Sequence, residues 1–230
     1  MDRNTVKLLG VAYLIQFFGS LISGPIFDAA TGSGDLPEKL VNISSNVMFM
    51  RSSIIAELVT GLAIIAMTVL LYVVLQKQNK AYALVALSFW LTEAIFLAVS
   101  SIGVNALIPL SIEYVQAGAP DPSYFITLGN QILAFKEFTF AIHMLLFGLG
   151  GILWYYLFYR SEYIPRVLAL WALILMPLMA IDVLLFLLGF GLESIVRMAI
   201  LFPLIAYLPY EGLMGIWFIV KGIDDRETIQ

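Results

Sequence analysis

Eight ionisable side chains lie inside or at the ends of long apolar stretches of this sequence, where a charge is hard to accommodate. They are Glu57, Glu93, Lys136, Glu137, His143, Asp182, Arg197 and Glu211. A charge at the centre of a membrane-spanning helix costs about 2.5–3.5 kcal/mol, so such groups normally face a bundle interior or a wet cavity rather than lipid. These residues are therefore the candidates for any chemistry that the protein performs.

Acids outnumber bases in this group. Five carboxyls stand against Lys136 and Arg197, with Arg51 at the rim of its apolar stretch. Isolated burial of a carboxylate is unfavourable, so we expect at least one of these groups to hold a proton or to meet a bound cation. A ligand in their midst would be cationic or proton-coupled, because a negative field repels anions.

Helical spacing sorts the residues by face. Glu57 shares a face with Thr60, Glu93 with Ser100, Lys136 with His143, and Arg197 with Tyr207 and Glu211, while Tyr13, Gln16 and Ser20 form a polar stripe and Glu137 points elsewhere. We expect a polar cavity that opens to the outer side of the membrane and binds a small molecule or ion. Its binding residues, drawn from five helices, are predicted to be Glu57, Glu93, Lys136, His143, Asp182, Arg197 and Glu211.

Two other interpretations stay open. Two carboxyls in different environments, or His143 with Asp182, could perform acid–base catalysis on a lipid-like substrate. The chain could instead be a non-catalytic membrane subunit or sensor whose buried pairs hold helices together. The sequence has no cysteine, one histidine and no nucleophile or metal-ligand motif, so we assign no catalytic residue, metal site or cofactor.

The elements that must position these residues are long apolar helices. Hydrophobic residues make up 61% of the 230 residues and charged residues only 12%, which is typical of a polytopic membrane protein. Backbone polar groups cannot stay unpaired in lipid, so each apolar stretch must be helical. The expected all-α bundle has six transmembrane helices, over about 6–28, 52–75, 81–108, 130–158, 165–190 and 196–220.

Positive charges set the expected orientation. Eight of the twelve basic residues fall on one side of a six-helix arrangement: Arg3, Lys7, Lys77, Lys80, Arg160, Arg166, Lys221 and Arg226. The positive-inside rule places this side, with both termini, in the cytoplasm. The predicted location is the plasma (inner) membrane, with the lipid bilayer as partner. No basic patch indicates nucleic-acid binding, and the sequence does not specify an oligomeric state.

Two connections on the opposite side are longer than the others. Residues 109–129 and 29–51 are rich in Gly, Pro, Asp and Ser. The second could form a short helix in the outer interface or an irregular loop. We find no repeat or linker, so residues 1–230 are expected to form a single domain.

Three stretches resemble a bacterial family known as domain of unknown function 4386. Residues 159–166 (Tyr-Arg-Ser-Glu-Tyr-Ile-Pro-Arg) resemble its Tyr-Arg-Ser-Gly-Tyr-Leu-Pro-Arg turn, and residues 89–94 (Phe-Trp-Leu-Thr-Glu-Ala) resemble its Phe-Arg-Leu-Val-Glu-Ala pattern. Glu211, Trp217, Lys221 and Gly222 are similar to its C-terminal pattern. The resemblance covers nearly the whole chain and implies a multi-span bacterial membrane protein, with no established activity.

The chain departs from the family pattern at two positions. Trp90 stands where the family often has Arg, so an expected charge partner of Glu93 is missing. Glu162 replaces a common Gly. Glu93 and Glu211 are the interior acids that fall on the family's patterns.

Overall fold

The computed structural model describes residues 2–118, 123–190, 207 and 209–223, and these form helices joined by short connections, with no strand among them. The helices are α1 (Arg3–Thr31), α2 (Leu36–Ser45), α3 (Val47–Leu75), α4 (Lys80–Gln116), α5 (Ser123–Ser161) and α6 (Arg166–Leu187). A further helical segment covers residues 209–220 and is called the C-terminal helix below.

Five helices, α1, α3, α4, α5 and α6, are long and apolar enough to cross a membrane. The predicted all-helical, multi-span architecture is therefore confirmed. About half of the sixth predicted span, 196–220, lies outside the described residues, and Tyr207 and the C-terminal helix are its described part.

Two helices extend further than the predicted spans. We expected a connection over 109–129, but α4 continues through Pro109 to Gln116, and α5 begins at Ser123. At 1.5 Å per residue, these helices of 37 and 39 residues are about 55 and 58 Å long, well beyond the roughly 30 Å hydrocarbon layer. The extensions form because their apolar faces pack against each other and against α2.

The segment before α3 contains a short helix, which was one of the two alternatives for residues 29–51. The Asp35 side chain accepts a hydrogen bond from the backbone N–H of Glu38 (3.1 Å) and caps the start of α2, where Pro37 cannot donate one. Leu40 and Ile43 are fully buried, mainly against α4. This end of the bundle is thus closed by a packed helix.

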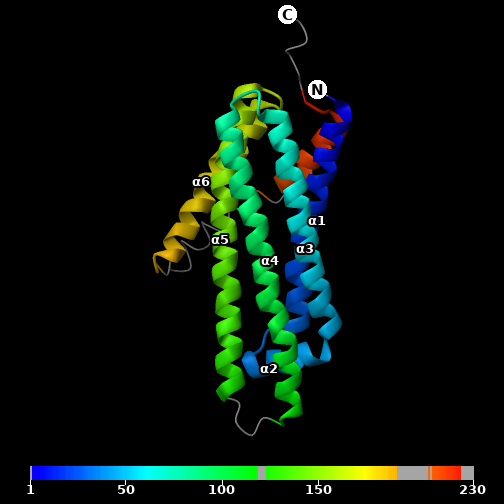
Figure 1. The fold of residues 1–230 in the computed structure, drawn as a ribbon, viewed down its shortest axis with the longest axis vertical. Helices are drawn as coiled ribbons and strands as arrows, with labels where there is room; N and C mark the ends of the chain where they lie inside the picture. Colours follow the sequence, from blue (N-terminus) through cyan, green and yellow to red (C-terminus); the bar gives the residue numbers. More distant parts are fainter. Residues whose placement is uncertain (1, 119–122, 191–206, 208, 224–230) are drawn as a thin grey trace, which may run out of the picture.

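Neighbouring helices run antiparallel and place their connections at two ends of the bundle. The start of α1 and the α3–α4 and α5–α6 turns lie at one end, while α2, the end of α4 and the start of α5 lie at the other (Figure 1). The C-terminal helix packs on α1, where a methyl group at Gly10 would come 2.6 Å from the carbonyl oxygen of Gly215. Glycine at this position permits the close approach.

Two apolar clusters fill the bundle, one toward each end. The larger cluster includes Leu71, Trp90, Trp154, Tyr155 and Met176, and the smaller one, beside α2, includes Leu40, Ile43, Met50, Val104 and Leu107. Along α4 the first cluster stops at Leu97 and the second starts at Val104. The layer between the two clusters holds Ser100 and Ser101 of α4, whereas Glu93 lies at the edge of the larger cluster.

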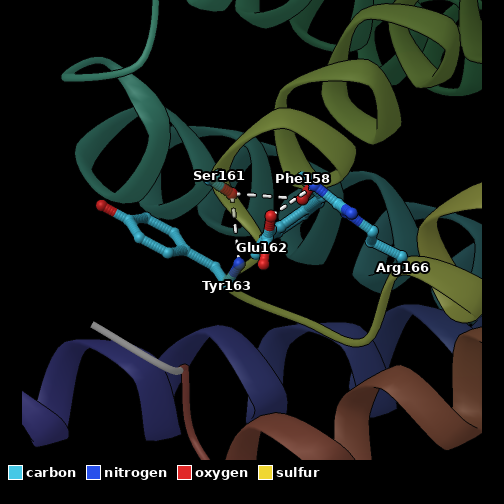
Figure 2. Close-up of polar contacts among 5 residues, drawn as sticks. All are labelled: Phe158, Ser161, Glu162, Tyr163 and Arg166. Carbon is cyan, nitrogen blue, oxygen red and sulfur yellow. Dashed lines mark hydrogen bonds and ion pairs between the residues drawn. The ribbon is translucent and has the colours of Figure 1, made fainter. Parts of the chain in front are cut away.

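The α5–α6 turn has a backbone conformation that explains one departure from the family pattern. Glu162 adopts φ 57°, in the left-handed region that glycine occupies without strain. Ser161 Oγ accepts from the N–H of Tyr163 (3.3 Å) and donates to the carbonyl of Phe158 (3.2 Å), while Glu162 pairs with Arg166 (Figure 2). The turn therefore keeps its shape with a strained residue at the position where the family has Gly.

Replacing Glu162 by Gly should stabilise the protein by about 0.5–1 kcal/mol. The left-handed conformation destabilises the protein by roughly 1–2 kcal/mol when the residue is not glycine. An exposed ion pair such as Glu162–Arg166 stabilises it by only about 0.3–0.5 kcal/mol. Glu162→Gln, the control, removes the charge and keeps the strain, so it should be slightly less stable than the parent. Thermal unfolding in detergent measures the melting temperatures of the parent and the two variants. A Gly variant that melts below the Gln variant would contradict the argument.

Replacing Gly150 by Ala should destabilise the bundle by about 1–3 kcal/mol, because it overfills a packed site. The added methyl group would lie 2.6 Å from Nε1 of Trp90, which is fully buried and cannot move aside easily. Gly61→Ala is the matched control, since its methyl group meets only the carbonyl oxygen of Ala94 at 3.5 Å. Equal melting temperatures for the two variants would show that the Trp90 contact is not tight.

Candidate functional site

A cavity of about 210 Å³ lies at the edge of the larger apolar cluster, whose Ile64, Leu97 and Phe147 line part of it. Five helices enclose it: α1, α3, α4, α5 and the C-terminal helix with the nearby Tyr207. Its polar lining residues are Gln16, Ser20, Ser23, Glu57, Thr60, Glu93, His143, Tyr207 and Glu211. Its apolar lining residues are Ile64, Leu97, Phe140, Met144 and Phe147.

Helical periodicity brings these side chains to the cavity. Gln16, Ser20 and Ser23 are spaced four and three residues apart, so they share one face of α1. Phe140, His143, Met144 and Phe147 follow the i, i+3, i+4, i+7 pattern on α5. The lining of the cavity is therefore one face of each helix.

Glu93 and His143 form the closest pair of ionisable groups in the cavity. Glu93 Oε1 lies 3.6 Å from His143 Nδ1, slightly beyond hydrogen-bond distance, and Glu93 is 1% exposed. Neither Glu93 Oε2 nor His143 Nδ1 has a hydrogen-bond partner among the described residues. Such buried, unpaired polar atoms are rare in folded proteins and often mark a functional site.

Glu211 provides a second deep carboxyl. It is 5% exposed, lies beside the Gln16 side chain, and is close enough to Glu93 for the two acids to interact electrostatically. Gln16 Oε1 is also buried without a hydrogen-bond partner in the described part of the chain. The floor of the cavity thus offers two oxygen acceptors, Glu93 Oε2 and Gln16 Oε1, that no donor of the described residues satisfies.

Glu57 is the best-compensated carboxyl of the three. Its Oε2 accepts a hydrogen bond from Ser101 Oγ (2.8 Å), and Lys136 acts on it electrostatically. Glu57 is only half-buried, and Ser20 across from it on α1 is exposed. The cavity therefore deepens from Glu57 toward Glu93 and Glu211, and its shallow side faces the α2 end of the bundle.

The structure brings together four of the seven predicted binding residues: Glu57, Glu93, His143 and Glu211. Lys136 does not line the cavity, and its ammonium group lies over the ring of Phe27, 4.6 Å from the centroid. Glu137 is exposed on another face of α5. Arg197 lies outside the described residues.

Asp182 is also separate from the cavity, because α6 packs against a different face of α5. That face carries Gly148 and Gly151, where an added methyl group would meet Met176 and Ala180 of α6. His143, Phe147 and Gly150 turn instead toward α4. In the described structure, the carboxyl that lies next to His143 is that of Glu93.

Trp90, which stands where an arginine was expected, is a packing residue. It is fully buried, its indole N–H donates to the carbonyl of Phe147 (3.0 Å), and its ring stacks on that of Phe147 (centroids 5.7 Å apart). It supplies no charge to Glu93. The indole fixes the part of α5 that carries the cavity-lining rings.

A network of tyrosine hydroxyls adjoins the cavity, and sequence reasoning did not find it. Tyr155 Oη lies 2.6 Å from Tyr207 Oη and 3.5 Å from Tyr13 Oη, and all three side chains are buried. Tyr155 lies in α5, whose sequence carries no polar stripe at this point. The sequence feature that points to this network is the position of Tyr13 and Tyr207 on polar helix faces, because buried hydroxyls there need interior hydrogen-bond partners.

The fold and the cavity define a multi-pass helical membrane protein with a carboxyl-lined interior. The family described as "Domain of unknown function (DUF4386)" matches residues 8–222, and the chain belongs to this family. The resemblance inferred from the three sequence stretches is therefore confirmed. No curated protein and no solved structure matches the chain.

Proposed function

We propose that the protein binds, and by binding carries, a small cationic or proton-coupled solute in the cavity. The observation that supports this is the composition of the lining: Glu57, Glu93 and Glu211 share one cavity, and no Lys or Arg is among its described lining residues. A carboxylate in a low-dielectric interior needs a proton, a cation or several hydrogen-bond donors. The described protein groups supply little of this to Glu93.

The electrostatics of the cavity favour both the entry and the binding of cations. A cleft with one sign of charge and apolar walls concentrates counter-ions and repels ions of the same sign. Glu93 and Glu211 lie deep, whereas Lys136, which acts electrostatically on Glu57, lies outside the lining. The same arrangement disfavours anionic ligands such as phosphates or carboxylic acids.

An acid–base enzyme that acts on a lipid-like substrate is the second candidate function, favoured by the Glu93–His143 pair. A carboxyl and an imidazole 3.6 Å apart can share a proton, and such pairs serve in general acid–base catalysis. This candidate differs from the carrier in one respect: a Glu93→Gln variant would still bind its ligand but would no longer convert it.

We further propose six spans with both termini in the cytoplasm of the cell. Seven of the eight basic residues used for the orientation are described, and each belongs to the start of α1, the α3–α4 turn, the α5–α6 turn or the end of the C-terminal helix. These four places lie at one end of the bundle (Figure 1). One basic end is what the positive-inside rule requires of a cytoplasmic face.

Reporter fusions test this topology. A reporter placed after Lys77 and one placed at the C-terminus should both register the cytoplasm, because both follow basic ends. A reporter in the α4–α5 connection near Pro120 should register the opposite compartment. The proposed topology is wrong if the Lys77 and Pro120 reporters fall in the same compartment.

Cation binding can be measured on the purified protein as a thermal shift, since a ligand that binds the folded state raises its stability. The probes are chlorides of sodium, potassium, magnesium and small amines at constant ionic strength. At least one should raise the melting temperature, and Glu93→Gln or Glu211→Gln should weaken its binding roughly tenfold or more, because each removes a buried charge.

Glu137→Gln is the matched control, since this side chain is exposed on α5 and does not line the cavity. It should bind the probe as the parent protein does. A folded Glu93→Gln variant that responds to every probe like the parent would contradict the proposal and favour a purely structural role for the interior acids.

A further inference from the structure

We infer that the solute is an organic ammonium compound, with N–H donors on an apolar body, rather than a bare metal ion. This inference rests on the proposed function and narrows the ligand class. It is carried by the arrangement of the oxygen acceptors, by the aromatic rings beside them and by the size of the cavity.

The carboxyls are arranged for a ligand larger than a metal ion. A metal ion needs several ligands at about 2.0–2.6 Å, which brings their side chains into one tight cluster. Among the described residues, no three His, Asp or Glu side chains converge closely enough to hold one. Glu93 and Glu211 come from α4 and the C-terminal helix, and Glu57 is engaged by Ser101. The three carboxyls therefore line a space that can hold a molecule, and they do not converge on the position of a single metal ion.

The buried acceptor oxygens at the floor of the cavity match the N–H donors and the charge of an ammonium group. Glu93 Oε2 and Gln16 Oε1 are buried acceptors without donors in the described structure, and their residues are 1% and 6% exposed. A protonated primary amine is a compact cation with three N–H donors. It supplies both the positive charge that the buried carboxyl needs and the N–H donors that Glu93 Oε2 and Gln16 Oε1 lack in the described structure.

Aromatic rings stand next to these acceptors. Phe147 and Tyr207 contact each other edge to face (centroids 5.3 Å apart), and the ring of Phe140 lies 5.5 Å from that of His143. A cation within about 6 Å of a ring face is attracted by the ring quadrupole, which is the usual means of recognising organic ammonium groups. Bare inorganic cations keep a hydration shell that Ile64, Leu97 and Met144 could not replace.

The volume suits an amine of a few carbon atoms. The cavity of about 210 Å³ corresponds to the share of about seven water molecules in the liquid, at roughly 30 Å³ each. A six-membered carbon ring with one ammonium group fits within this space. Its body would contact the apolar wall, and its nitrogen would point toward Glu93.

Cyclohexylammonium and cyclohexanol form a matched pair of probes, because they have similar shapes and differ in charge and donors. Calorimetry on the purified full-length protein at pH 7 should show at least tenfold tighter binding of cyclohexylammonium than of cyclohexanol or potassium ion. Glu93→Gln should remove most of this difference. Phe140→Leu should weaken ammonium binding about three- to fivefold by removing a ring.

Phe138→Leu is the control for the ring, since Phe138 is exposed on the same helix and does not line the cavity. It should leave the affinity unchanged. Loss of affinity in Phe138→Leu equal to that in Phe140→Leu would overturn the ring contact, as would an unaffected Phe140→Leu variant.

The outcomes separate this inference from the proposed function. Glu93-dependent binding of sodium, potassium or magnesium without binding of cyclohexylammonium would overturn the ammonium assignment and leave a cation site in place. Equal binding of cyclohexanol and cyclohexylammonium, or no binding of any cation, would overturn both.

Discussion

The structure depends on the high free energy of a carboxyl group placed among acyl chains. Glu93 and Glu211 lie within long apolar segments, and contact with lipid would cost several kcal/mol for each ionised group. The bundle avoids this by turning both side chains inward, to the edge of the larger apolar cluster that borders the cavity. Polar side chains of the layer between the two clusters, Gln16 and Thr60 among them, line the other side of this cavity.

The two apolar clusters keep this layer open. Trp90 anchors α4 to α5 through its bond to the Phe147 carbonyl and its contact with Gly150, so the helices cannot close over the space. At the other end, α2 packs against the extension of α4 and holds the helices in place. A cavity between two rigid clusters is pre-organised, which lowers the entropy that a ligand must lose in ordering its site.

The sequence predicted the helices and their polar faces well, since both follow from the 3.6-residue period. Glu57 with Thr60, Gln16 with Ser20, and Tyr207 with Glu211 share the cavity as their spacing indicated. It could not predict which faces meet. Lys136 and His143 share a face by spacing, yet only His143 reaches the cavity, and Asp182 follows α6 to another side of α5. Helix crossing and register decide these outcomes, and both depend on packing between distant segments.

The three carboxyls differ in how well the protein compensates them, and this difference gives the cavity a direction. Glu57, at the shallow side, has a hydrogen bond from Ser101 and a nearby Lys136, so a cation gains little by stopping there. Glu93 Oε2 has no hydrogen-bond partner among the described residues and Glu211 has the Gln16 side chain beside it, so a cation gains most by continuing inward. Because protein groups compensate the deeper carboxyls less than Glu57, a ligand can enter the cavity without being held at its shallow side. A carrier needs this property, because a site that binds tightly at its entrance would slow its own loading.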